Sequence, residues 1–313
     1  TIDQLQECVW NSLKDDEEAQ MAFLVRYGKL SIAEEKSMYR KKITAALQSA
    51  KGGRSFLDPY ASKKWARGLD QLLIDATESI HEGVYQGPVV LSFLILERTH
   101  KLMDRIDDSY GDLSDSIDYA LFNLLLVGED AAALEDKERK LYLKMALEAY
   151  RKEYLSDWDW HNKILEFALD LAFDRAELEK VNQHFIDFHG SGEPKYSSNL
   201  PLKAELVRRL EGEIAHLVFL RKYQSHWEIK ELLVEKLLEA QSYEEAQKVC
   251  KEALKEDSVY QHHKVNWQKY LVKIASLQGD NSLALTESRT LFLSSSSFEV
   301  DQYRELKGWV EPK

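Results

Sequence analysis

The residues most suited to chemistry in this sequence are glutamates that precede a histidine by three positions. The pairs are Glu78 with His81, Glu97 with His100, and Glu213 with His216. This spacing places a carboxylate and an imidazole on one face of a helix, as in the di-metal centres of helix bundles. Such a centre needs carboxylates from two further helices, which the sequence does not identify. We therefore expect no metal and no other cofactor, and Glu97/His100 and Glu213/His216 remain the only candidates.

The sequence gives even less support for a catalytic nucleophile, a phosphate-binding loop or a calcium site. The sequence has no Gly-x-Ser-x-Gly motif and no glycine-rich phosphate loop, and its cysteines, Cys8 and Cys250, lie far apart without a neighbouring base. We expect Cys250 to be a small buried apolar residue. The acidic turn at 107–112 lacks the spacing of a calcium loop, so we expect Asp112 or Ser114 to cap the following helix instead.

Two further clusters have a chemical and a structural interpretation. The segment Trp158-Asp-Trp160-His161 could stack a ligand, but tryptophans at a helix start more often pack that helix against its neighbour. His262 and His263 are adjacent and so point to different faces of a helix, which disfavours shared metal binding. The structural interpretation is preferred for both.

Composition predicts an all-α protein. The 313 residues are 44% hydrophobic and 31% charged, with only 13 glycines and 5 prolines, which favours long helices over strands and turns. The formal net charge of −12 argues against a large nucleic-acid surface. No apolar run is long enough to span a membrane and no signal peptide is visible, so we expect a cytoplasmic protein without membrane contact.

Local signals predict where helices begin and end. Ser31 with Glu34 forms a capping box for a helix that Gly52 and Gly53 end, and Asp58 followed by proline begins the next helix. The run 89–106 is so apolar that we expect a helix buried on most of its circumference. Gly, Ser and Pro cluster at 191–201, which predicts a linker between an N-terminal helical block (1–190) and C-terminal hairpins (202–313), or a long loop within one continuous solenoid.

Two helical hairpins near the C-terminus resemble each other. Tyr243, Glu245, Ala246 and Cys250 in one have counterparts around Gly279 and Ala284 in the other. Small residues let antiparallel helices approach closely, and the apolar residues behind them seal the pair against its neighbours. The pattern resembles the tetratricopeptide repeat, which implies an α-solenoid, a superhelical stack of antiparallel hairpins.

A second resemblance covers more of the chain. The turn at 107–112 after a long apolar helix, the Trp158-Asp-Trp160 segment, and residues 267–292 followed by Tyr303-Arg-Glu-Leu-Lys are similar to the helical region of bacterial SWIM zinc-finger proteins. This resemblance implies the helical fold. The clustered Cys and His of the finger are missing here, so its nucleic-acid role does not carry over.

Three functions follow as hypotheses. The first is a non-catalytic scaffold or adaptor that binds a protein or peptide of unknown identity, because helical stacks present long recognition surfaces. Its expected contact residues on the C-terminal hairpins are Lys230, Lys236, Tyr243, Gln247 and Lys251. The second is a metal-dependent enzyme that uses the Glu-x-x-His pairs. The third is an accessory module of a nucleic-acid-associated protein. Oligomeric state cannot be read from the sequence.

Overall fold

The computed structural model describes residues 30–53, 55–190, 197–256 and 261–294, and six isolated residues nearer the termini. Within them the chain forms thirteen α-helices, and the only β-type pairing there is one bridge between Leu57 and Ile106. The predicted all-α class, with helices packed as stacked hairpins, is confirmed. No helix in this part of the chain has the length and apolar character needed to cross a membrane.

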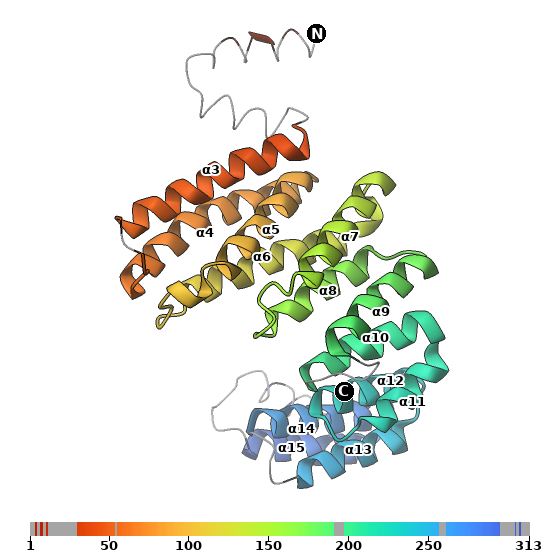
Figure 1. Cartoon of the computed structure of the whole chain (residues 1–313). Helices are drawn as coiled ribbons and strands as arrows, with labels where there is room; N and C mark the ends of the chain where they lie inside the picture. The colour runs from red at the N-terminus through yellow and green to blue at the C-terminus, as the bar shows by residue number, and fades with distance from the viewer. Residues whose placement is uncertain are drawn as a thin grey trace. The chain divides into compact units, whose positions relative to one another are not determined.

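The chain divides into two compact units, Thr1–Glu193 and Pro194–Lys313. The division falls inside the Gly-, Ser- and Pro-rich segment expected at 191–201, of which 191–196 lie outside the described residues. Three short 3₁₀ turns, Met103–Arg105, Ala131–Ala133 and Ser197–Asn199, connect helices. The first unit holds α3 (Ile32–Lys51), α4 (Pro59–His81), α5 (Gln86–His100), α6 (Asp112–Glu129), α7 (Asp136–Arg151), α8 (Trp160–Leu171) and α9 (Arg175–His189) (Figure 1).

The first two helices begin and end as their sequences predict. The Ser31 hydroxyl accepts a hydrogen bond from the Glu34 N–H, and the Glu34 carboxylate accepts one from the Ser31 N–H at 2.8 Å, which completes a capping box. Gly52 ends α3 in the left-handed conformation. Asp58 caps α4 by accepting from the Ala61 N–H at 2.8 Å, with Pro59 in the first turn.

Helix α5 lies at the centre of the first unit. It contacts α3, α4, α6 and α7, and 11 of its 15 residues are buried, which explains why its sequence is apolar on nearly every side. A Cβ on Gly87 would lie 2.9 Å from the Tyr39 hydroxyl, so any larger residue there would force the tyrosine or the helix to shift. Gly68 plays the same part between α4 and α3, because its Cβ would lie 2.9 Å from that of Ala46.

Two predictions for this region are wrong: where the helix that begins near residue 89 ends, and which residue caps α6. A continuous helix was expected over 89–106, but α5 ends at His100. Beyond it the chain turns and becomes extended at Ile106, where the Leu57 N–H donates to the Arg105 carbonyl and the Asp107 N–H to the Leu57 carbonyl, each at 2.9 Å. The capping residue of α6 also differs. Asp108, not Asp112 or Ser114, accepts from the Leu113 and Ser114 N–H groups, at 3.0 and 2.8 Å.

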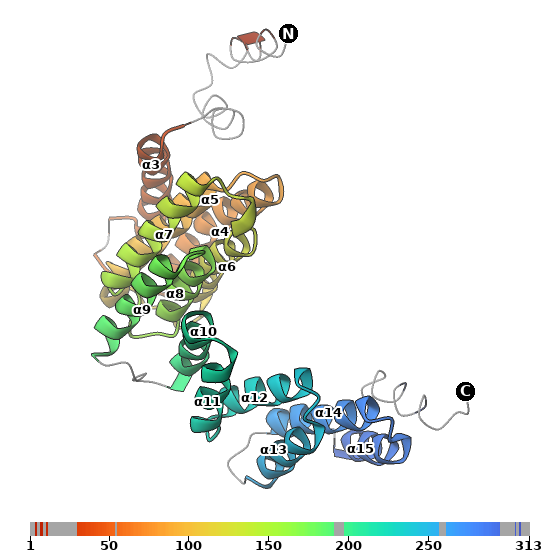
Figure 2. The same ribbon diagram turned by 90° about the vertical axis from the view of Figure 1, so that its right-hand side faces the viewer.

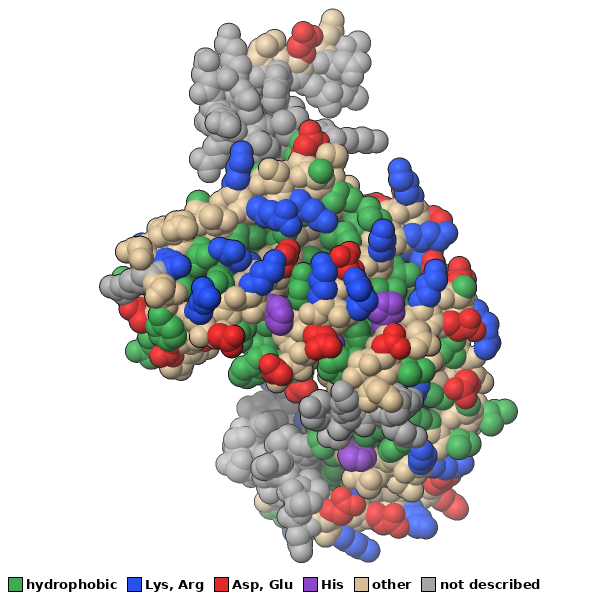
Figure 3. All heavy atoms as spheres, in the orientation of Figure 1, with side chains coloured by type: hydrophobic (Ala, Val, Ile, Leu, Met, Phe, Trp, Pro, Cys, Tyr) green, Lys and Arg blue, Asp and Glu red, His purple; other side chains and the backbone are tan. Residues whose placement is uncertain are grey.

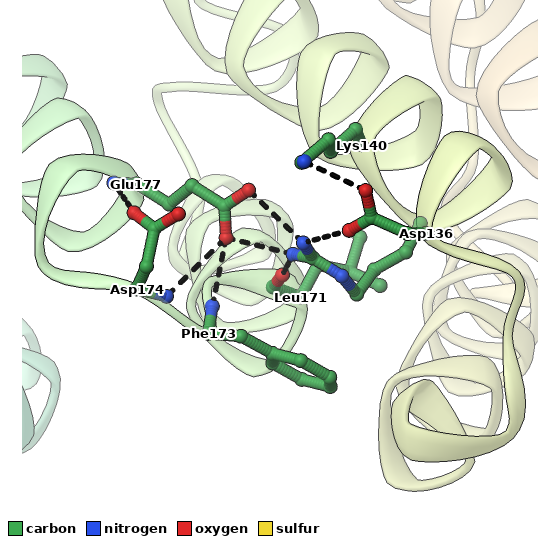
Figure 4. Close-up of polar contacts among 7 residues, drawn as sticks. Asp136, Lys140, Leu171, Phe173, Asp174 and Glu177 are labelled. Carbon is green, nitrogen blue, oxygen red and sulfur yellow. Dashed lines mark hydrogen bonds and ion pairs between the residues drawn. The ribbon is translucent and has the colours of Figure 1, made fainter.

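A buried ion pair joins α7 to the first turn of α9 (Figure 4). Arg139 donates to both carboxylate oxygens of Glu177, at 2.7 and 3.0 Å, and also to the Leu171 carbonyl. The same carboxylate accepts from the Phe173 N–H at 2.9 Å. Burial raises the pKa of Glu177, but these hydrogen bonds and the charge of Arg139 outweigh it and hold that pKa below its ordinary value.

The second unit is a succession of hairpins, in which each helix packs on the next along the chain (Figure 2). Its helices are α10 (Leu200–Glu211), α11 (Glu213–Lys222), α12 (Trp227–Glu239), α13 (Tyr243–Lys255), α14 (Gln261–Leu277) and α15 (Asn281–Ser294). Ala246 and Ala284 are fully buried, as close packing of the α12/α13 and α14/α15 hairpins requires. Trp267 and Cys250 lie in the same core.

Removing Arg139 should be costly, because it leaves the Glu177 carboxylate buried without its countercharge. We expect Arg139→Met to lower the free energy of unfolding by about 3–5 kcal/mol, measured by urea denaturation. Adding Glu177→Gln to that variant should restore at least about 1 kcal/mol of the free energy of unfolding. The unpaired buried charge disappears, while the glutamine side-chain oxygen still accepts the hydrogen bond from the Phe173 N–H. Arg175→Ala, which breaks an exposed pair with Glu179, should cost under about 1 kcal/mol. Equal losses from Arg139→Met and Arg175→Ala would contradict this role.

Candidate binding surface

The first predicted metal pair, Glu97 with His100, is engaged in other contacts. Glu97 accepts from Lys101 and lies 3.7 Å from Arg40. The Nδ1 atom of His100 accepts a hydrogen bond from the Leu155 N–H at 3.2 Å, and its ring lies against Tyr154. The carboxylate therefore faces cations, which compete with a metal ion for its charge.

The second pair, Glu213 with His216, is divided between surface and core. Glu213 is exposed and pairs with Lys236 at 3.3 Å and with Arg208 at 3.4 Å. His216 is buried, and its Nδ1 lies 2.8 Å from the Ala204 carbonyl, so it donates to that oxygen. Among the described residues, no group of three or more His, Cys, Asp or Glu side chains is placed to hold a metal ion.

The contacts expected on the C-terminal hairpins differ in accessibility. Lys230 is buried, and its Nζ lies 2.6 Å from Glu256, so its charge links α12 to the end of α13. Lys236 pairs with Glu239 at 2.8 Å. Tyr243 is half-buried against the core of the second unit, Gln247 is half-buried and Lys251 is exposed. The use of this surface by a partner stays a prediction.

The aromatic segment 158–161 runs into the start of α8, and part of it packs inside the fold. His161 is buried and stacks on Tyr150 with 3.9 Å between ring centroids, and burial lowers the pKa of His161 to about 4. The Trp160 Nε1 donates to Asp118 at 3.0 Å, whereas Trp158 is 55% exposed.

Burial raises the pKa of the Cys250 thiol to about 12, so that sulfur stays protonated. The side chains of His262 and His263 lie outside the described residues.

A groove on the first unit gathers cationic side chains that sequence analysis did not single out. Three adjoining hollows, of about 740, 240 and 150 Å³, all include Arg40 in their lining and run over α3, α5 and α7. Figure 3 shows Lys and Arg side chains gathered on this part of the surface. The cations that line these hollows, which define the cationic groove, are Lys36, Arg40, Lys41, Arg98, Lys101 and Lys152.

The charge of the groove is opposite to that of the whole chain. Against its six cations stand two acidic side chains, Glu97 and Glu148, in a protein whose formal net charge is −12. Arg98 is half-buried, and its Nε atom has no hydrogen-bond partner in the part of the chain that the structure describes. A buried donor without an acceptor costs free energy.

The cations lower the pKa of both acidic groups in the groove. Burial raises the pKa of Glu97, but the hydrogen bond from Lys101 and the charges of Lys101, Arg40 and Lys152 lower it overall. A hydrogen bond and the charge of Lys152 likewise lower the pKa of Glu148, with a smaller contribution from Lys36. Both groups therefore stay ionised to acidic pH, and the excess of positive charge persists.

Helix α3 also buries a carboxyl group, near the start of α5. Glu35 is only 5% exposed, and its Oε2 has no hydrogen-bond partner among the described residues. Burial raises the pKa of Glu35 to about 7, although a hydrogen bond with Gln86 opposes the shift. The side chain thus changes charge near neutral pH, on a buried face of the helix whose exposed side carries Lys36 and Arg40.

Sequence analysis missed the cationic groove because its three parts are far apart in the chain. The spacing of Lys36 and Arg40, and of Arg98 and Lys101, is a weak signal of shared helix faces. Nothing in the sequence brings those faces together with Lys152, since that depends on how α5 packs against α3 and α7.

Fold and surface together define an all-α protein of stacked helical hairpins with a cationic groove on its first unit. No family model, no curated protein sequence and no solved structure matches this chain. The resemblance to the helical region of SWIM zinc-finger proteins therefore stays a prediction.

The buried Glu35 predicts a pH-dependent stability. Its pKa is higher in the folded chain, about 7, than its ordinary 4.5, so the carboxyl has no effect on stability below pH 4.5. The fold then loses stability as the pH rises from 4.5 to 7, because the unfolded chain ionises first, and the loss is complete above pH 7. Relative to wild type, Glu35→Gln should therefore raise the free energy of unfolding by roughly 2–3 kcal/mol at pH 8 and by little at pH 4.5. Urea titrations at both pH values test this.

The exposed Glu129 offers a control for that measurement. Glu129→Gln should change the free energy of unfolding by under about 0.5 kcal/mol at pH 8. A gain from Glu35→Gln that is equal at both pH values would show that the carboxyl does not titrate in this range.

Proposed function

We propose that this chain is a non-catalytic scaffold that binds a partner protein or peptide, and that the cationic groove is its principal contact surface. The observation that carries the proposal is the concentration of six cations around three adjoining hollows in an acidic protein. Charge complementarity of this kind steers and orients association. Stacked helical hairpins supply a rigid frame for such a surface.

The alternative of a metal-dependent enzyme has less support. It would have to use Glu97 with His100 or Glu213 with His216, and each of these groups already has a hydrogen bond or an ion pair within the fold. Displacing those contacts would cost free energy before any metal is bound. The groove, in contrast, has six cations against two acidic side chains, so its positive charge is not balanced within its lining.

Site-specific photocrosslinking tests the proposal. A benzophenone amino acid would replace the exposed Thr44, which lines two of the three hollows, and the variant would be irradiated in the cells that make the protein. We expect discrete crosslinked adducts at this position. The same replacement at Gln247 samples the C-terminal surface, and at the exposed Glu179 it samples a surface with no proposed role.

Adding Arg40→Glu should remove the Thr44 adducts, because it reverses the charge that all three hollows share. Adducts at Gln247 alone would move the contact surface to the second unit. If no position gives adducts while circular dichroism shows intact helix, the scaffold role is wrong.

A further inference from the structure

A pair of tryptophan rings lies where the loop after α7 runs into α8 (Figure 1). The indole rings of Trp158 and Trp160 pack on each other, with 5.3 Å between their centroids and 32° between their planes. Trp160 is half-buried, and its Nε1 donates to Asp118 on α6, whereas Trp158 is 55% exposed. The fold therefore fixes one ring, and that ring supports a second one that is open to solvent.

The backbone holds Trp158 in place although its side chain is exposed. Its N–H donates to the Leu155 carbonyl at 3.1 Å, and its carbonyl accepts from the His161 N–H at 3.3 Å. Leu155 is buried in the left-handed conformation, with a φ of 57°, and its N–H donates to His100 at 3.2 Å. A non-glycine residue keeps this conformation only where surrounding contacts enforce it. The open indole is thus positioned before a ligand arrives, which lowers the entropy cost of binding.

Carboxylates accompany the open ring. Asp157 and Asp159 flank Trp158 in the chain and are exposed, and neither forms an ion pair among the described residues. Lys163, which approaches this group from α8, is already paired with Asp118 at 3.2 Å. Two carboxylates beside the indole therefore lack a countercharge in the part of the chain that the structure describes, and they attract positive charge.

An indole face next to carboxylates is suited to an organic cation. The electron-rich face of tryptophan attracts an ammonium or guanidinium group more strongly than the other aromatic rings do. A planar guanidinium can also stack on a ring while it donates hydrogen bonds to a carboxylate. Nucleic acid fits less well, because its bases could stack on the indole but its phosphates would be repelled by Asp157 and Asp159.

We infer that Trp158, supported by Trp160 and flanked by Asp157 and Asp159, binds an arginine side chain of a partner protein. This inference goes beyond the proposed function, because the site lies outside the cationic groove and selects the opposite charge. It gives the scaffold a second contact surface. A proline-rich segment also docks on exposed tryptophan, but it gains nothing from the carboxylates.

Fluorescence anisotropy with the full chain tests this inference. The probe is a labelled peptide of about ten residues that alternates Arg with Gly, and we expect saturable binding. Trp158→Ala should weaken it about fivefold, because the open indole face is lost. Trp158→Phe should weaken it only about twofold, because the smaller ring still attracts a cation.

The matched control for the ring is Tyr110→Ala. Tyr110 is 72% exposed and also lies in an acidic segment, between Asp108 and Asp112 in the chain. This variant should leave the affinity within about twofold. Equal losses from Tyr110→Ala and Trp158→Ala would show attraction to an acidic protein in general and would overturn the inference. Circular dichroism confirms that the variants fold.

A second pair of variants tests the carboxylates. Asp157→Asn with Asp159→Asn should weaken binding of the Arg peptide about threefold or more. Glu129→Gln with Glu244→Gln removes the same charge from exposed positions elsewhere and should weaken binding by under about twofold. A loss from the glutamate pair as large as that from the aspartate pair would overturn the inference.

Two further ligands test the cation itself. A peptide with citrulline in place of Arg keeps the planar shape without the charge and should bind at least about tenfold more weakly, as should a proline-rich peptide of equal length. Equal or tighter binding of either would show a neutral occupant and overturn the inference. The result is separate from the groove, because Thr44 adducts in cells report on the groove and loss of binding in Trp158→Ala reports on this site.

Discussion

The burial of α5 among four other helices is the constraint on which the rest of the first unit depends. A helix with 11 of 15 residues buried cannot shift without exposing apolar surface in several directions. Its position fixes α3 on one side and α7 on the other, and therefore the spacing of the cations that these helices carry. Its end at His100 also places Arg98 and Lys101 where the helix dipole favours positive charge. Lys152 occupies the equivalent position at the end of α7.

Stability and surface charge are opposed within α3. One face of this helix presents Lys36 and Arg40 to the groove, while the other buries Glu35 without a full set of hydrogen bonds. The ion pair of Arg139 and Glu177 shows the alternative, because there every carboxylate oxygen is matched by a donor. The Arg139–Glu177 pair is thus fully matched, whereas Glu35 Oε2 and Arg98 Nε are buried without a hydrogen-bond partner among the described residues.

Much of the fold could be predicted from the sequence because the signals are local. The Ser31/Glu34 capping box, the Asp58 cap and the burial of α5 follow from residues within a few turns of one another. The errors came from long-range contacts. Ile106 leaves the expected helix to pair with Leu57, and Asp108 takes the place of the expected cap of α6. The burial of Lys230 against Glu256, across a hairpin, also depends on a contact between elements. The cationic groove joins side chains more than 100 positions apart, which no local pattern reveals.

Gly68 and Gly87, which allow α3 to pack closely against α4 and α5, constrain how this sequence can change in evolution. Gly87 faces the Tyr39 hydroxyl and Gly68 faces Ala46, so the space for one more methyl group does not exist at either contact. A descendant of this chain that acquires alanine at position 87 must move or shorten the tyrosine, and one that acquires it at 68 must move α3 or lose the alanine opposite. These pairs should therefore covary, and a lineage that breaks the rule will have moved α3 relative to its neighbours.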